Sequence, residues 1–132
     1  DTLKENGITL SREQICNISL SSAREILVGL KRSPAPPTGL FASSDHIAWQ
    51  LYKAAGELSL SIPEDLSVIG FDDLPLGQTL VPGLTTIRQD IDLKAERTCE
   101  ILLRRLSQSK GTSETQILDV ELIPRASVKD LR

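Results

Sequence analysis

The sequence contains few aromatic residues and no methionine. Two phenylalanines, one tryptophan and one tyrosine make up 3% of its 132 residues. Hydrophobic residues still account for 39% of the chain, which is typical of a globular protein with its own core. Aliphatic side chains must therefore build that core, in a chain long enough for one compact domain.

The residue types that most often carry catalysis or bind metals are also scarce. His46 is the only histidine, and a surface or capping role in a helix first turn explains it. Cys16 and Cys99 have no metal-ligand spacing and no nearby histidine to activate a thiol. We expect both to be buried free thiols in a reducing compartment, although a disulfide stays open. The sequence therefore predicts a protein that is not an enzyme and holds no metal or cofactor.

Neither an excess of basic residues nor a long hydrophobic run is present. The formal net charge is -3, and the adjacent basic pairs 31–32 and 104–105 are typical of solvated helix faces. Since binding to phosphates needs a clustered basic face, we do not expect this chain itself to bind nucleic acid. No segment is long and apolar enough to span a membrane, and no signal peptide is visible. Because the first residue is Asp1, we expect a fragment of a longer protein.

Strand-like and helix-like hydrophobic patterns alternate along the chain. The predicted strands cover residues 15–20, 39–42, 66–71, 84–87 and 117–123. Gly7 is expected to end a first helix, and the later helices have candidate caps at Ser22 (in a capping box with Glu25), at residues 43–45 and at Asp90. The segments rich in proline and glycine near residues 75–83 and the polar residues 110–113 are predicted as loops. Such alternation is typical of an α/β fold, here a three-layer α/β/α arrangement with a mostly parallel sheet.

Two polar clusters follow predicted strands, where ligands bind in open parallel sheets. Ser43, Ser44 and Asp45 follow the strand that ends at Ala42, and Asp72 with Asp73 follows the strand that ends at Phe71. A carboxylate held at a strand end accepts hydrogen bonds from the hydroxyls of a sugar or another polyol. The alternative is structural, because Asp45 would also cap a helix and the aspartate pair would also solvate a turn.

Four segments resemble the LacI/GalR family of transcriptional repressors, in family order and with similar spacing. They are residues 39–48 (GLFASSDHIA), 60–73 (LSIPEDLSVIGFDD), 82–89 (PGLTTIRQ) and 118–127 (LDVELIPRAS). The resemblance covers essentially the whole chain and is weakest in the first 35 residues. It implies a periplasmic-binding-protein-like effector domain whose cleft closes on a sugar, nucleoside or purine. It also implies a cytoplasmic homodimer, with no membrane partner, that binds operator DNA through a helix-turn-helix absent from this chain.

The resemblance assigns three residues to the effector site. Asp72 matches the ligand-binding aspartate of the family. Ser44 stands where the family usually has asparagine, so that a hydroxyl replaces an amide. Ile18 falls near a position where members often carry an aromatic ring that stacks on the ligand, so stacking from this side is not expected here.

The resemblance also implies a subunit interface. Trp49 and Leu80 fall at positions that contact the partner subunit in this family. Helical spacing places Trp49 beside Tyr52, away from the apolar stripe of their helix. An exposed aromatic pair would anchor a dimer, and the alternative is a second layer of the core.

The family pattern divides the chain between two lobes. Residues 1–89 and 116–127 would form the carboxyl-terminal lobe, and residues 90–110 would be a helix that packs on an amino-terminal lobe absent from this sequence. We therefore expect the apolar stripe of that helix to be exposed. Its members are Ile91, Ala95, Cys99, Leu102 and Leu106.

Two other classes of protein were weighed. A periplasmic sugar-binding protein of an uptake system would have the same architecture, but the segments at 67–73 and 84–89 favour the repressor. An α/β enzyme would need a nucleophile or a base, and no candidate for either is present.

Overall fold

The structure, a computed structural model, describes residues 5–11, 14–18, 22–107 and 114–130. Its elements are α2 (Ala23–Lys31), β1 (Gly39–Phe41), α3 (Asp45–Glu57), β2 (Ser67–Phe71), α4 (Pro75–Thr79), β3 (Thr85–Gln89), α5 (Ile91–Ser107) and β4 (Val120–Ile123). The strands form one sheet in the order β1-β2-β3-β4, in which β1, β2 and β3 are parallel and β4 is antiparallel. The predicted α/β class with a mostly parallel sheet is confirmed.

Side-chain caps explain where the helices begin. The Ser22 hydroxyl accepts from the Glu25 N–H and the Glu25 carboxylate accepts from the Ser22 N–H, so the predicted capping box forms. Asp90 caps α5 by accepting from the Leu93 N–H at 2.9 Å. Gly7, at the end of the first predicted helix, has a φ of 72°, which glycine adopts without steric cost.

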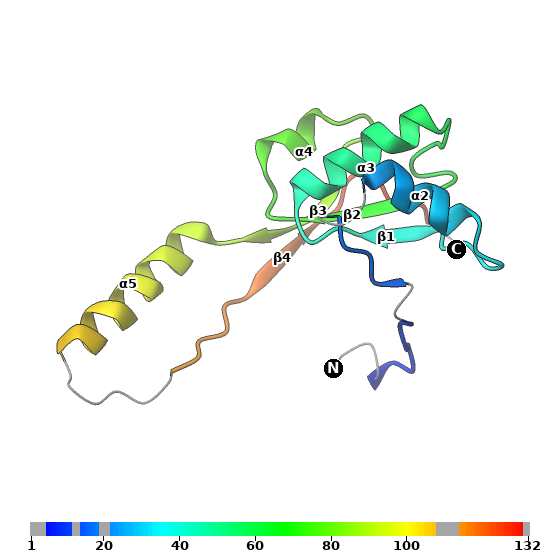
Figure 1. Cartoon of the computed structure of the whole chain (residues 1–132). Helices are drawn as coiled ribbons and strands as arrows, with labels where there is room; N and C mark the ends of the chain where they lie inside the picture. The colour runs from blue at the N-terminus through cyan, green and yellow to red at the C-terminus, as the bar shows by residue number, and fades with distance from the viewer. Residues whose placement is uncertain (1–4, 12–13, 19–21, 108–113, 131–132) are drawn as a thin grey trace.

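The core lies between the sheet and the helices that cover one of its faces. Figure 1 shows α2, α3 and α4 on the same side of the sheet. Val68 of β2 and Leu84 are fully buried there, against small residues of α3 such as Ala48 and Ala55. Phe41 is 61% exposed on the opposite face, where it meets Phe71 edge to face. The described residues therefore supply one of the two predicted helical layers.

Several predicted boundaries are wrong. Residues 14–18 form no strand, and among the described strands the edge strand β1 pairs only with β2. Residues 19–20 of that predicted strand and the predicted link at 110–113 lie outside the described residues. The last strand begins at Val120 instead of Ile117, because its partner β3 ends at Gln89, where the chain turns into α5.

The segment predicted as a loop near residue 75 contains a short helix. Pro75 occupies its first turn, after Leu74 in an extended conformation. Proline suits that position, because its missing N–H would have no partner within the helix and its fixed φ is helical. Pro75 was therefore a signal for the start of a helix, but it was interpreted as part of a loop.

Helix α5 extends away from the rest of the molecule (Figure 1). None of its residues is buried, and the exposed fractions of Ile91, Leu102 and Leu106 are 54%, 54% and 76%. The predicted exposure of its apolar stripe is confirmed. Cys99 on that stripe and Cys16 are both exposed, so their expected burial is wrong. Among the described residues, no helix has both the length and the apolar character that crossing a membrane requires.

Candidate functional site

A strained turn follows the carboxyl end of β2. Asp72 and Asp73 have φ values of 110° and 51°, in the region that favours glycine. Such conformations cost about 1–3 kcal/mol each and persist only where the surroundings hold them. The Asp72 N–H donates to the carbonyl of Ile87 in β3 at 2.8 Å, which fixes the start of the turn.

The carboxylate of Asp73 holds the turn from one side. Its Oδ1 accepts from Arg125 at 2.6 Å and its Oδ2 accepts from Arg88 at 2.7–2.8 Å, while the side chain is only 5% exposed. Burial alone would raise the pKa of Asp73. The hydrogen bonds and charges of Arg125 and Arg88 outweigh it and hold the pKa below its ordinary value. Arg125 also donates to the Leu84 carbonyl, which ties the turn to β3.

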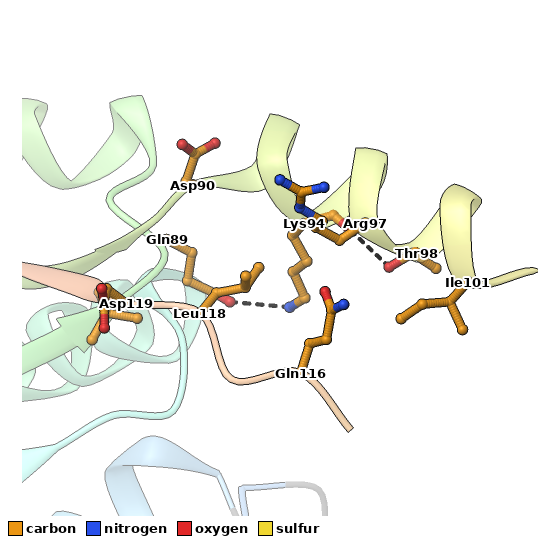
Figure 2. A pocket seen from close by; sticks show the side chains of 10 residues that line it. Gln89, Asp90, Lys94, Arg97, Thr98, Ile101, Gln116, Leu118 and Asp119 are labelled. Carbon is orange, nitrogen blue, oxygen red and sulfur yellow. Dashed lines mark hydrogen bonds between the residues drawn. The ribbon is translucent and has the colours of Figure 1, made fainter. Parts of the chain in front are cut away.

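The carboxylate of Asp72 points toward the start of α5. Its Oδ1 accepts from Gln89 Nε2 at 2.7 Å. Gln89 Oε1 in turn accepts from Lys94 Nζ at 3.0 Å (Figure 2). Gln89 is the last residue of β3 and Lys94 lies in the first turns of α5. A chain of hydrogen bonds therefore joins Asp72 to the helix that leaves the sheet.

Two adjoining hollows lie beside this chain of hydrogen bonds. An open hollow of about 650 Å³ is bordered by Asp72, Asp73, Arg88, the first residues of α5 and residues 119–121. A second one, of about 290 Å³, lies between α5 and residues 116–120 (Figure 2). Both include Gln89, Asp90 and Asp119 in their walls. Carboxylate and amide groups at such a wall accept hydrogen bonds from hydroxyl or amino groups of a ligand.

The structure brings only one of the three predicted effector residues to these hollows. Asp72 lines the larger one. Ser44 is the N-cap of α3, where its Oγ accepts from the Ile47 N–H at 3.3 Å. Ile18 is half-buried and packs against the hydrophobic core. Neither Ser44 nor Ile18 lines the hollow beside Asp72.

The predicted interface residues lie on α3 and on the loop that faces it. Trp49 is half-buried. The centroid of its ring lies 6.1 Å from the centroid of the His46 ring and 4.9 Å from Lys53 Nζ. Tyr52 is also half-buried, and its hydroxyl donates to the Pro82 carbonyl at 3.0 Å. Burial raises the pKa of Tyr52. Leu80, in the same loop, is partly buried against the core.

The sequence-based interpretation of Asp45 as a helix cap is wrong. Its side chain is fully buried, accepting from the Thr86 hydroxyl at 2.6 Å and from the Leu74 N–H at 2.7 Å. The sequence offered one signal for this role. Only one of residues 43–45 can cap the helix, so the side chain of Asp45 was free to bind elsewhere. The roles of Gln89 and Arg125 were also missed, since their partners are 17 and 52 residues away in the sequence.

The described residues contain no group of three or more His, Cys, Asp or Glu side chains placed to hold a metal ion. The site consists instead of hydrogen-bond acceptors that a partly buried ionic network holds at the carboxyl ends of β2 and β3. Within the described residues, the Asp72 carboxylate meets an amide and the Asp73 carboxylate meets guanidinium groups.

Comparison with known proteins places this chain in a family. Residues 1–128 match the family model described as "Periplasmic binding protein-like domain". The repressor PurR of Vibrio vulnificus is 33% identical over 98% of this chain, and the ribose operon repressor of Halalkalibacterium halodurans is 32% identical over 91%. The chain spans 39% and 38% of these two relatives.

A solved structure supports the same assignment. A LacI family transcriptional regulator from Enterococcus faecalis, crystallised with bound ribose, is 34% identical and superposes with a TM-score of 0.70. The superposition covers 83% of this chain and 40% of that one. With the family model matching nearly its entire length, the chain belongs to the periplasmic binding protein-like domain family, in the form that LacI-type transcriptional regulators carry.

Proposed function

We propose that this chain is the effector-binding and dimerisation part of a ligand-responsive transcriptional repressor. The observation that carries the proposal is Asp72, which a strained turn holds at the border of an open hollow. The relatives named above are repressors and not uptake proteins, which supports this function over delivery of a sugar to a transporter.

The proposed effector is a sugar, a nucleoside or a purine. Asp72 is a hydrogen-bond acceptor, and each of these ligands carries hydroxyl or N–H groups that donate to a carboxylate. The ribose in the related regulator from Enterococcus faecalis supports this class of ligand. The hollow is open, so this chain would supply one wall of the cleft and another part of the protein the opposite wall.

The proposal includes the division into two lobes. Residues 1–89 and 116–127 would form one lobe, and residues 90–110 would pack on a second lobe outside this chain. The exposed apolar stripe of α5 supports this arrangement, because an apolar helix face this long is stable in water only when something covers it. Effector binding would then change how the two lobes are arranged.

The remaining partners follow from the same proposal. The chain has a net charge of -3, so operator DNA would be bound by a helix-turn-helix in another part of the protein, as a symmetric dimer on a palindromic site. Trp49, Tyr52 and Leu80 would contact the second subunit. Repression of transcription would place the protein in the cytoplasm.

Calorimetry on the full-length protein that contains this chain tests the proposal, with ribose, adenosine and hypoxanthine as ligands. At least one should bind, and Asp72→Ala should weaken it by at least about tenfold, the scale of one hydrogen bond to a charged group. Glu64→Gln is the matched control, because this exposed carboxylate lies before the opposite end of β2. Retained affinity in Asp72→Ala would remove Asp72 from the site, and no binding by any of the three would count against the proposed effector class.

A further inference from the structure

The buried carboxylate of Asp45 lies directly beneath the turn that carries Asp72. Asp45 is the first residue of α3, and it has no exposed surface. Its Oδ2 accepts from the Leu74 N–H at 2.7 Å, and its Oδ1 accepts from the Thr86 hydroxyl at 2.6 Å. Leu74 follows the two strained aspartates, whereas Thr86 is a fully buried residue of β3. Asp45 therefore joins the end of the turn to the middle of the sheet.

The surroundings of Asp45 are built to accommodate a carboxylate. A Cβ at Gly70 would overlap Asp45 Oδ1, so glycine is required at this position of β2. Gly77 of α4 lies on the other side, where a Cβ would be 3.4 Å from Oδ2, an ordinary contact. The N-terminus of α3 favours a negative charge, which lowers the cost of burying one there.

Other contacts also hold the turn, and at its start the Asp72 N–H donates to the Ile87 carbonyl. Asp73 is bound by Arg125 and Arg88, and the Asp72 side chain is bound by Gln89. Of the residues in these side-chain contacts, Asp72, Asp73, Arg88 and Gln89 line the hollow. The contact from Asp45 to the Leu74 N–H fixes the backbone from the interior.

We propose that Asp45 is a positioning residue, which from inside the fold clamps the strained turn so that Asp72 faces the effector. The proposal rests on the effector-binding function of Asp72 given above. Asp45 would not touch the effector, because it is buried behind the turn and does not line the hollow. Without Asp45 the Leu74 N–H would lose its acceptor, and the turn would relax from its two unfavourable φ values.

Hydrogen exchange measured by NMR on the full-length protein tests the clamp without any ligand. In Asp45→Ala the Leu74 amide should exchange at least about tenfold faster than in the wild type, because its acceptor is gone. The Val68 amide, which donates to the Ser127 carbonyl, should be unchanged. Equal acceleration at both amides would make Asp45 a residue of general stability and would overturn the positioning role.

Two further variants and one control variant keep the test decisive if Asp45→Ala does not fold. Asp45→Asn retains an acceptor oxygen of the same size but no charge, so the Leu74 amide should exchange at a rate between the wild type and Asp45→Ala. Gly70→Ala should displace Asp45 and accelerate Leu74 exchange, whereas Gly77→Ala, which has room for its Cβ, should not. A Leu74 amide that stays protected in Asp45→Asn and Gly70→Ala would contradict the clamp.

Ribose affinity is the functional readout. Asp45→Asn should bind ribose at least about threefold more weakly than the wild type, since a neutral acceptor forms the weaker hydrogen bond. Unchanged affinity beside faster Leu74 exchange would overturn the functional part of the proposal. If the wild type does not bind ribose, whichever of adenosine and hypoxanthine it binds takes the place of ribose. If it binds none of the three, the proposed effector class fails, while the exchange of Leu74 still decides whether Asp45 holds the turn.

Discussion

At the scale of single residues, Asp73 illustrates how a side chain holds an unfavourable backbone in place. Its φ of 51° costs free energy, and the ion pairs of its carboxylate with Arg125 and Arg88 offset that cost. Arg125 is 18% exposed and Arg88 is 49% exposed, so solvent screens the second pair more than the first. We therefore regard Arg125 as the stronger of the two partners.

The depressed pKa of Asp73 predicts a specific pH dependence. In the folded state the carboxylate loses its proton at a lower pH than in the unfolded state, so the unfolded state binds more protons in between. The stability that Asp73 contributes is therefore present above the ordinary carboxyl pKa of about 4, and it is lost as the pH falls through the lower, folded value.

Asp73→Asn should remove this dependence. We expect a free energy of unfolding about 2 kcal/mol lower at pH 7, the scale of hydrogen bonds to charged groups, with the difference shrinking below pH 4. Urea unfolding of both proteins at pH 2.5 to 7 measures this difference in the free energy of unfolding. Glu64→Gln, at an exposed position, is the control for net charge. A constant difference across that range would mean that the pKa of Asp73 is not depressed.

At the scale of elements, the caps decide where the helices start. Three consecutive polar residues precede α3, and the structure selects the middle one. Ser44 has the extended φ of -158° and accepts from the Ile47 N–H, whereas Ser43 is exposed and Asp45 is used in the interior. A cap satisfies an N–H that has no partner within the helix.

Two serine substitutions separate the cap from its neighbour. Ser44→Ala should lower the free energy of unfolding by about 1 kcal/mol, the usual contribution of an N-cap side chain. Ser43→Ala should stay within about 0.5 kcal/mol of the wild type, as exposed substitutions do. Thermal or urea unfolding of both variants provides the comparison, and an equal loss in the two would show that Ser44 does not act as the cap.

Long elements with a clear hydrophobic pattern were predicted well, and short ones were not. The near-continuous apolar run of β2 and the capping box of α2 appear in the structure where expected. Helix α4 has five residues, too few for a hydrophobic period, and its proline suggested a loop. The predicted strand at 15–20 failed in its described part because a strand needs a paired neighbour, which no local pattern reveals.

At the scale of the whole molecule, two surfaces remain for partners. One is the apolar stripe of α5, which no described part of the chain covers. The other is the region around Trp49, where an aromatic ring, a lysine and a histidine meet at a half-buried surface. They belong to different proposed contacts, the first with a second lobe and the second with a second subunit.

Substitution of Trp49 tests the proposed dimer. Trp49→Arg should weaken self-association of the full-length protein by at least about tenfold, because tryptophan is enriched among the residues that dominate interface energetics. Sedimentation velocity should therefore show a shift from dimer to monomer. Trp49→Phe keeps an apolar ring and serves as the control, and an unchanged mass of Trp49→Arg would exclude Trp49 from the interface.

The sequence by itself determined the fold class, the positions of the main helices and strands, and Asp72 as a residue at a strand end. These depend on local patterns, since hydrophobic period, caps and turn residues act over a few positions. Only the tertiary structure decided that Ser44 and Ile18 lie outside the hollow, that Asp45 is a buried anchor, and that Arg125 and Gln89 hold the turn. These roles depend on contacts between residues 17 to 52 positions apart, whose distances in space are set by how the strands align in the sheet.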